Sequence, residues 1–179
     1  PGAYRPSPFW TRHAPPMTRE KVWLNGWGNK MLRSFGVAKL TVVDVRPEAA
    51  FKQSHVPFAV NIPAEVFKRN LATPAKLAEV LAAAGVNVNY EAVIVSQGGL
   101  NADSALAYLL LQEVGQKRVS VFSESVDDWA FAGFALDKEA GTAIAPTTYP
   151  VSLRTGIGPS DAQGGPGPYP EVHLAPGQA

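Results

Sequence analysis

Short runs rich in β-branched residues alternate with helical segments through the middle of this chain. Four runs are expected to be strands: residues 40–45, 59–62, 92–95 and 119–122. Five intervening segments are expected to be helical: residues 48–52, 64–70, 74–84, 101–114 and about 125–133. This alternation favours an α/β fold, a mainly parallel sheet flanked by helices, with ligand sites beyond the carboxyl ends of the strands.

Two of the helices carry further signals. For residues 74–84, Thr73 is expected to be the N-cap, Pro74 fits the first helical position, and Gly85 stands where a C-terminal glycine belongs. In the helix over 101–114, apolar residues cover nearly the whole circumference. We therefore expect that helix to be buried on most sides.

Both ends of the chain are rich in residues that disfavour regular structure. The first 16 residues include five prolines, and residues 141–179 include seven prolines and seven glycines. The predicted layout is an extended N-terminal arm (1–17), one domain (18–140) and a Pro/Gly-rich C-terminal arm or linker (141–179). Some apolar side chains leave open whether the arms pack on the domain or on a partner: Phe9, Trp10, Tyr149, Tyr169 and Val172.

Composition excludes several classes of function. The chain has no cysteine, which removes disulfides and thiolate nucleophiles, and a formal net charge of +1 gives no general field for nucleic acid. No apolar run has the length of a membrane-spanning helix, no cofactor is implied, and His13 and His173 form no recognisable metal motif. The absent initiator Met and the extended cysteine-free termini suggest an exported, periplasmic location with a signal already removed.

Three stretches of the sequence resemble one family. Val42-Val43-Asp44-Val45-Arg46, followed by Ser54-His55-Val56-Pro57 and Asn61-Ile62-Pro63, is similar to the opening of rhodanese-like, thiosulfate sulfurtransferase-type domains. The likeness continues through 93–110 and 121–134, so it covers about residues 38–139. It implies a single rhodanese-like domain in which Asp44, Arg46, His55 and Trp129 are structural residues of the family motif.

The resemblance also places Ser96 where the family has a catalytic cysteine that holds sulfur as a persulfide. Oxygen cannot form that S–S bond, so this position is expected to be degenerate, whether the serine is native or engineered. The related phosphatase pattern would need arginine at the sixth residue after the nucleophile, where this chain has Ala102. The loop also lacks the family's basic residue and is followed by Asp103, and Glu124-Ser125-Val126 replaces the usual Gly-Gly-Trp.

Alternatives remain open for this loop. Its backbone amides could bind an anion through the residues Ser96, Gln97, Gly98, Gly99, Leu100 and Asn101. The glycines could instead merely allow the tight turn from strand to helix. Ser96-Gln97-Gly98 is also half of a Gly-x-Ser-x-Gly nucleophile motif, although no triad can be assembled from the sequence. Elsewhere, Trp23 and Trp27 share a helical face, for which packing in the core or at an interface is the default interpretation.

The sequence therefore predicts a catalytically inactive rhodanese-like module that serves in protein interaction or assembly. An alternative is the inactive half of a tandem-domain thiosulfate sulfurtransferase, in which a cysteine-bearing sister domain transfers sulfur. A serine hydrolase that uses Ser96 is the third hypothesis. The expected partners are a protein or a sister rhodanese domain, with no nucleic acid.

Overall fold

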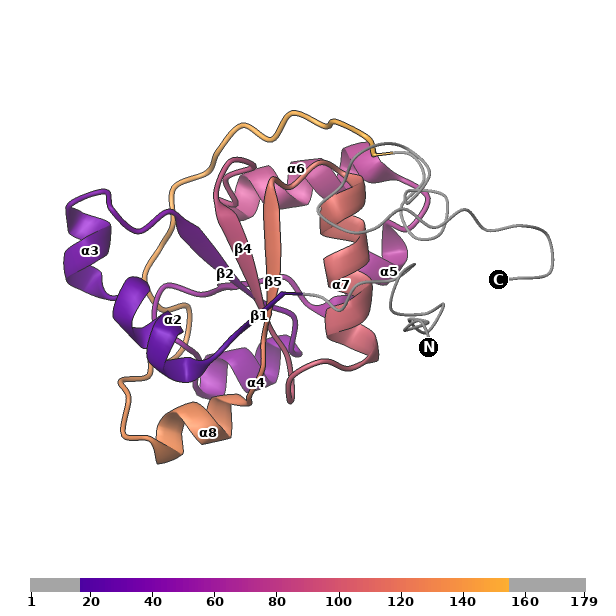
Figure 1. Cartoon of the computed structure of the whole chain (residues 1–179). Coiled ribbons are helices and arrows are strands. Elements are labelled where there is room, and N and C mark those ends of the chain that lie inside the picture. Colours follow the sequence, from indigo (N-terminus) through magenta and orange to yellow (C-terminus); the bar gives the residue numbers. More distant parts are fainter. Residues whose placement is uncertain (1–16, 155–179) are drawn as a thin grey trace, which may run out of the picture.

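A parallel sheet of five strands forms the centre of the computed structural model, which describes residues 17–154 (Figure 1). The strands are β1 (Thr18–Arg19), β2 (Leu40–Asp44), β3 (Val60–Asn61), β4 (Glu91–Val95) and β5 (Arg118–Phe122). Their order across the sheet is β1-β5-β4-β2-β3, and every pair is parallel. Every residue of β2 and β4 is buried, as expected for apolar strands covered on both faces.

Helices cover both faces of the sheet. They are α2 (Lys21–Trp27), α3 (Lys30–Ser34), α4 (Glu48–Gln53), α5 (Ala64–Arg69), α6 (Pro74–Ala84), α7 (Ala102–Glu113) and α8 (Val126–Phe131). On one face α5, α6 and α7 build a core around Phe67, Leu81 and Leu111. On the other, α2, α4 and α8 contribute Leu24, Phe51 and Trp129 to a second core. Among residues 17–154, no helix combines the length and the apolar character needed to cross a membrane.

The predicted α/β fold class is confirmed, and the four expected strands and five expected helices appear with boundaries shifted by one or two residues. Pro74 is the first residue of α6, and Gly85 ends it in the left-handed region with φ +87°. Thr73 is the N-cap residue, as predicted, but its hydroxyl makes no cap hydrogen bond and instead donates to Asn70 Oδ1 at 3.0 Å.

Helix α7 is less buried than its sequence predicts. It buries Ser104, Ala107, Leu110 and Leu111 against the sheet and α5. Leu109 is exposed, and Leu106 and Tyr108 are only half-buried. The expectation of burial on most sides is therefore met in part, because one face is fully buried, Leu106 and Tyr108 pack half-buried on the same core, and Leu109 is exposed.

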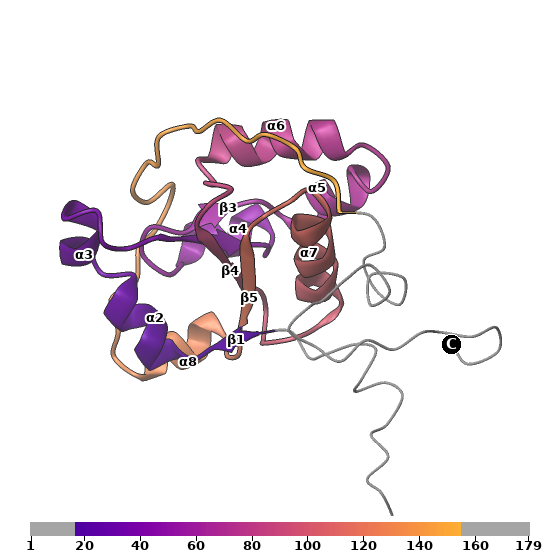
Figure 2. The same cartoon turned by 45° about the horizontal axis from the view of Figure 1, so that its top comes forward.

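Residues 141–154 form no helix or strand but run along the body of the domain past α6 and α7 (Figure 2). Their backbone is held by hydrogen bonds from Thr147 N to Ala82 O and from Ser152 N to Val114 O. Tyr149 is buried in the core, and its hydroxyl donates to Gln116 Oε1 at 2.7 Å. Burial raises the pKa of this phenol well above its usual range. The other residues singled out in the arms, Phe9, Trp10, His13, Tyr169, Val172 and His173, lie outside the described residues.

Candidate functional site

Ser96 is the first residue beyond the carboxyl end of β4, and it is 1% exposed. Its Oγ donates to the carbonyl of Gly99 at 2.8 Å and accepts from Asn101 Nδ2 at 2.9 Å. A longer contact of 3.4 Å comes from the Gly98 amide. A serine hydroxyl has one proton and two lone pairs, so these three contacts use its full hydrogen-bonding capacity.

The helix cap of α7 fixes the orientation of Asn101. Its Oδ1 accepts from Ser104 N at 3.0 Å, so the amide nitrogen must face Ser96. Ser104 Oγ in turn accepts from Asn101 N at 2.8 Å and donates to the Gly99 carbonyl at 2.9 Å. Sequence reasoning missed Ser104 as a loop residue, although Asn101-x-x-Ser104 has the spacing of a capping box.

The remaining amides of the loop are partly occupied as well. Gly99 N donates to the carbonyl of Glu124 at 3.2 Å, which ties the loop to the segment before α8. Beside the loop, the carboxylate of Asp103 lies 3.7 Å from Lys68 Nζ, which also pairs with Glu65. Three loop amides thus have acceptors inside the protein, and the nearby lysine is engaged with carboxylates. Anion binding by residues 96–101 stays a prediction.

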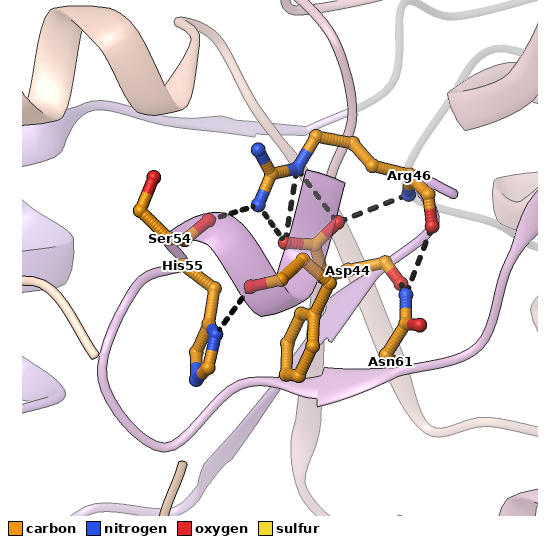
Figure 3. A network of polar contacts seen from close by, with 6 residues as sticks. Asp44, Arg46, Ser54, His55 and Asn61 are labelled. Atoms are coloured by element: carbon orange, nitrogen blue, oxygen red, sulfur yellow. Dashed lines mark hydrogen bonds and ion pairs between the residues drawn. The ribbon is translucent and has the colours of Figure 1, made fainter. Parts of the chain in front are cut away.

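Asp44 and Arg46 form a buried network at the end of the neighbouring strand β2 (Figure 3). Arg46 Nη2 lies 2.8 Å from Asp44 Oδ2 and also donates to the carbonyl of Ser54 at 2.8 Å. Asn61 Nδ2 donates to the carbonyls of Asp44 and Arg46, both at 2.9 Å. The network fastens the segment between α4 and β3 to the sheet.

His55 follows Ser54 in the chain and is fully buried beside this network (Figure 3). Its Nδ1 lies 2.8 Å from the Phe51 carbonyl, and its ring stacks on that of Phe51 with centroids 3.7 Å apart. Within residues 17–154, its Nε2 has no hydrogen-bond partner. Backbone hydrogen bonds in both directions join His55 to Asp137.

Trp129 packs in the same hydrophobic core as Phe51. Its Nε1 donates to the Ala135 carbonyl at 2.8 Å, and its ring meets the rings of Phe122 and Phe134 edge to face. The structure pairs Asp44 with Arg46 and places His55 next to Ser54, whose carbonyl Arg46 contacts. The hydrogen bonds of Ser96 go to none of these side chains. The hydrogen-bond partners of Ser96 among the described residues are two backbone groups and an amide, and none is a general base.

The comparisons with known proteins agree with the fold. A profile of the Rhodanese-like domain matches residues 26–132. A search of curated proteins returned no match.

Several solved structures are similar. SseA from Escherichia coli, described as a 3-mercaptopyruvate sulfotransferase, has a TM-score of 0.65 at 15% identity, covering 79% of this chain and 59% of that one. YnjE has a TM-score of 0.60 at 14% identity, covering 78% of this chain and 35% of that one. An uncharacterised protein from Saccharomyces cerevisiae has a TM-score of 0.51 at 16% identity, covering 67% and 95%. The chain thus spans about three fifths of the length of SseA, and likeness at these identities shows the fold alone.

Proposed function

Because the chain belongs to the rhodanese-like domain family, we propose that it is a catalytically inactive member of that family which serves in protein interaction or assembly. The observation that carries this proposal is the state of Ser96, which the sequence resemblance places at the cysteine position. Its hydroxyl is buried, and all its hydrogen-bonding capacity is used within the loop.

The chemistry of sulfur transfer explains why this arrangement is inert. Transfer needs a thiolate that attacks the donor sulfur and then holds it through an S–S bond. To form an alkoxide, the Ser96 hydroxyl would have to lose the proton that it donates to the Gly99 carbonyl, and a carbonyl oxygen cannot act as a base at neutral pH. The lack of a general base beside the Ser96 hydroxyl also counts against the hypothesis that the chain is a serine hydrolase.

An exposed apolar surface supports a role in interaction. We call it the α2–α3 surface and define it by Val22, Trp27, Met31, Phe35 and Val37. All five are exposed, and Phe35 has 76% of its surface accessible. Exposed apolar side chains on neighbouring elements are a feature of surfaces that bind another protein.

A second candidate is the inactive half of a tandem-domain thiosulfate sulfurtransferase. In favour of it, the chain spans 59% of SseA and 35% of YnjE, so related folds occur within longer proteins. The α2–α3 surface would then face a sister domain. Finding a cysteine-bearing rhodanese-like domain in the same polypeptide would favour this candidate.

The test of inactivity is a thiosulfate-to-cyanide assay on the full chain and on Ser96→Cys. We expect no thiocyanate from the natural chain and no labelling of Ser96 by a fluorophosphonate probe. Thiocyanate production by the natural chain would overturn the proposal. Thiocyanate production by Ser96→Cys, with none from the natural chain, would show that the absence of a thiol at position 96 accounts for the inactivity.

The test of interaction compares Phe35→Glu with Phe131→Glu, whose side chain is 95% exposed at the end of α8. We expect a tagged chain to lose its co-purifying native partner with the first change and keep it with the second. Equal recovery with both variants would contradict a role for the α2–α3 surface. A deletion meant to probe the C-terminal arm should begin after residue 154, because Tyr149 is part of the core.

A further inference from the structure

A cavity of about 570 Å³ lies at the end of β4 opposite to Ser96. Its walls are Trp23 and Trp27 of α2 and the residues that begin β2, β4 and β5, among them Leu40 and Glu91. None of the loop residues 96–101 lines it. The volume falls within the range typical of sites for small molecules.

Charge in this cavity is unbalanced. Among residues 17–154, four cationic side chains line it, and Glu91 is the one carboxylate. Glu91 is 6% exposed, and its two oxygens each lie 2.8 Å from a guanidinium nitrogen of Arg19. Ser120 Oγ donates to the same carboxylate at 2.9 Å. The carboxylate that the described residues place in the wall is thus already paired with Arg19.

The other three cations are left in excess. Arg118 Nε is 3.9 Å from Glu91 Oε1, but the Arg118 side chain is largely exposed. Lys39 and Lys117 are exposed and form no ion pair with any carboxylate among residues 17–154. Three positive groups therefore border one open space, where a ligand anion would be attracted by all of them.

Aromatic surface borders the same space. The Arg19 guanidinium lies 3.9 Å from the centroid of the Trp23 ring, and its bidentate pairing with Glu91 holds it there. Trp27 follows one helical turn later, 47% exposed, beside the exposed Val37. An indole that is half accessible offers a flat apolar face to a planar ligand.

From these features we propose that the cavity binds a small aromatic anion, whose ring packs on Trp27 and whose carboxylate, sulfonate or phosphate group lies among Lys39, Lys117 and Arg118. The Arg19–Glu91 pair anchors the wall and does not itself bind the anion. This binding site goes beyond the interaction role, although it shares Trp27 and Val37 with the α2–α3 surface, and it is independent of Ser96.

The probe is 8-anilinonaphthalene-1-sulfonate, with N-phenyl-1-naphthylamine as the neutral counterpart of the same ring system. Binding to the full chain is measured by fluorescence titration, and the location by NMR of the indole N–H groups, assigned with single Trp→Phe variants. Lys39→Gln combined with Lys117→Gln removes two cations from the cavity. Lys76→Gln combined with Lys138→Gln removes two exposed lysines elsewhere and serves as the matched control.

We expect the sulfonate to bind about tenfold more tightly than the neutral probe and to shift the indole resonances of Trp23 and Trp27. This difference in affinity should disappear in the Lys39→Gln/Lys117→Gln variant and persist in the control variant. Equal affinity of the two probes, or equal loss in the two double variants, would overturn the proposal. A shift confined to Trp129, which lines a different cavity, would overturn it as well. The Ser96→Cys variant should bind the probe like the natural chain, so this result stands apart from the test of inactivity.

Discussion

Polar groups are buried at both ends of β4, but different kinds of hydrogen-bond partner stabilise them. At the carboxyl end, the neutral hydroxyls of Ser96 and Ser104 converge on the carbonyl of Gly99. At the amino end, a buried carboxylate, Glu91, is matched to the guanidinium of Arg19. Both networks are well paired, but they differ in what they leave over. The first uses the full hydrogen-bonding capacity of the Ser96 hydroxyl, and the second lies beside three further cations and the Trp27 indole.

This difference bears on which end of a parallel strand can bind a ligand. In parallel α/β folds the carboxyl ends of strands are the usual ligand sites. Here the hydroxyl at that end is closed by its own hydrogen bonds, whereas the surplus of charge lies at the opposite end. We therefore infer a ligand site at the amino end of β4 from its unpaired cations, whereas anion binding by residues 96–101 stays a prediction.

The largest effect is expected from removal of the charge at the amino end. Glu91→Ala should lower the free energy of unfolding by about 3 kcal/mol, because it leaves Arg19 without its partner in a mostly buried place. Glu65→Ala, whose carboxylate is 77% exposed beside Lys68, should change it by less than about 0.5 kcal/mol. Urea unfolding measures both. Equal losses would mean that the Glu91 network is no more important than a surface pair.

The same carboxylate should make stability depend on pH. Burial pushes the pKa of Glu91 upward, but hydrogen bonds from Arg19 and Ser120 outweigh it and hold the pKa below its ordinary value. A depressed folded-state pKa gives stability that is complete above the unfolded pKa and is lost as the pH falls through the folded value. Glu91→Gln should therefore lose less stability than the natural chain between about pH 5 and 3.

An intermediate effect is expected at Gly99. This residue has φ +59°, and a Cβ there would lie 2.9 Å from the carbonyl oxygen of Ser123. Gly99→Ala should cost about 2 kcal/mol through backbone strain and that contact. Gly98→Ala is the matched control, because a Cβ at Gly98 meets nothing within 4 Å. Equal melting temperatures for the two variants would show that the loop accommodates a side chain at position 99 without strain.

The sequence predicted the framework of the fold because its local signals were strong. Continuous β-branched runs mark β2, β4 and β5, and Pro74 and Gly85 mark both ends of α6. By contrast, β1 has only two residues, one of them Arg19, and its pairing with β5 is not visible in any local pattern. The Arg19–Glu91 pair joins residues 72 positions apart, so no spacing rule could have found it.

Two details differ from what the sequence predicts, one through a local contact and one through the layer order of the fold. Thr73 has the right residue type for a cap, but Asn70 offers its hydroxyl another acceptor. Leu109 is apolar, yet the layer order leaves its side of α7 toward solvent. At the candidate site, the position of Ser96 was predictable, whereas the saturation of its hydroxyl depends on the rotamer of Asn101 and on Ser104.

The smallest effect is expected at Ser96 itself. Ser96→Ala removes one donor to the Gly99 carbonyl, but Ser104 still donates to that carbonyl and Asn101 is close enough to solvent to find water. The loss should be about 1 kcal/mol. Because both hydroxyls are neutral, this loss should be the same at about pH 4 and pH 8, unlike that of Glu91→Gln. Chemical unfolding at the two pH values measures the difference. A larger loss of stability on Ser96→Ala at pH 4 than at pH 8 would show that an ionisable group is coupled to the loop, and Asp103 is the carboxylate nearest to the loop in the sequence. The contrast between a neutral and a charged end of β4 would then fail.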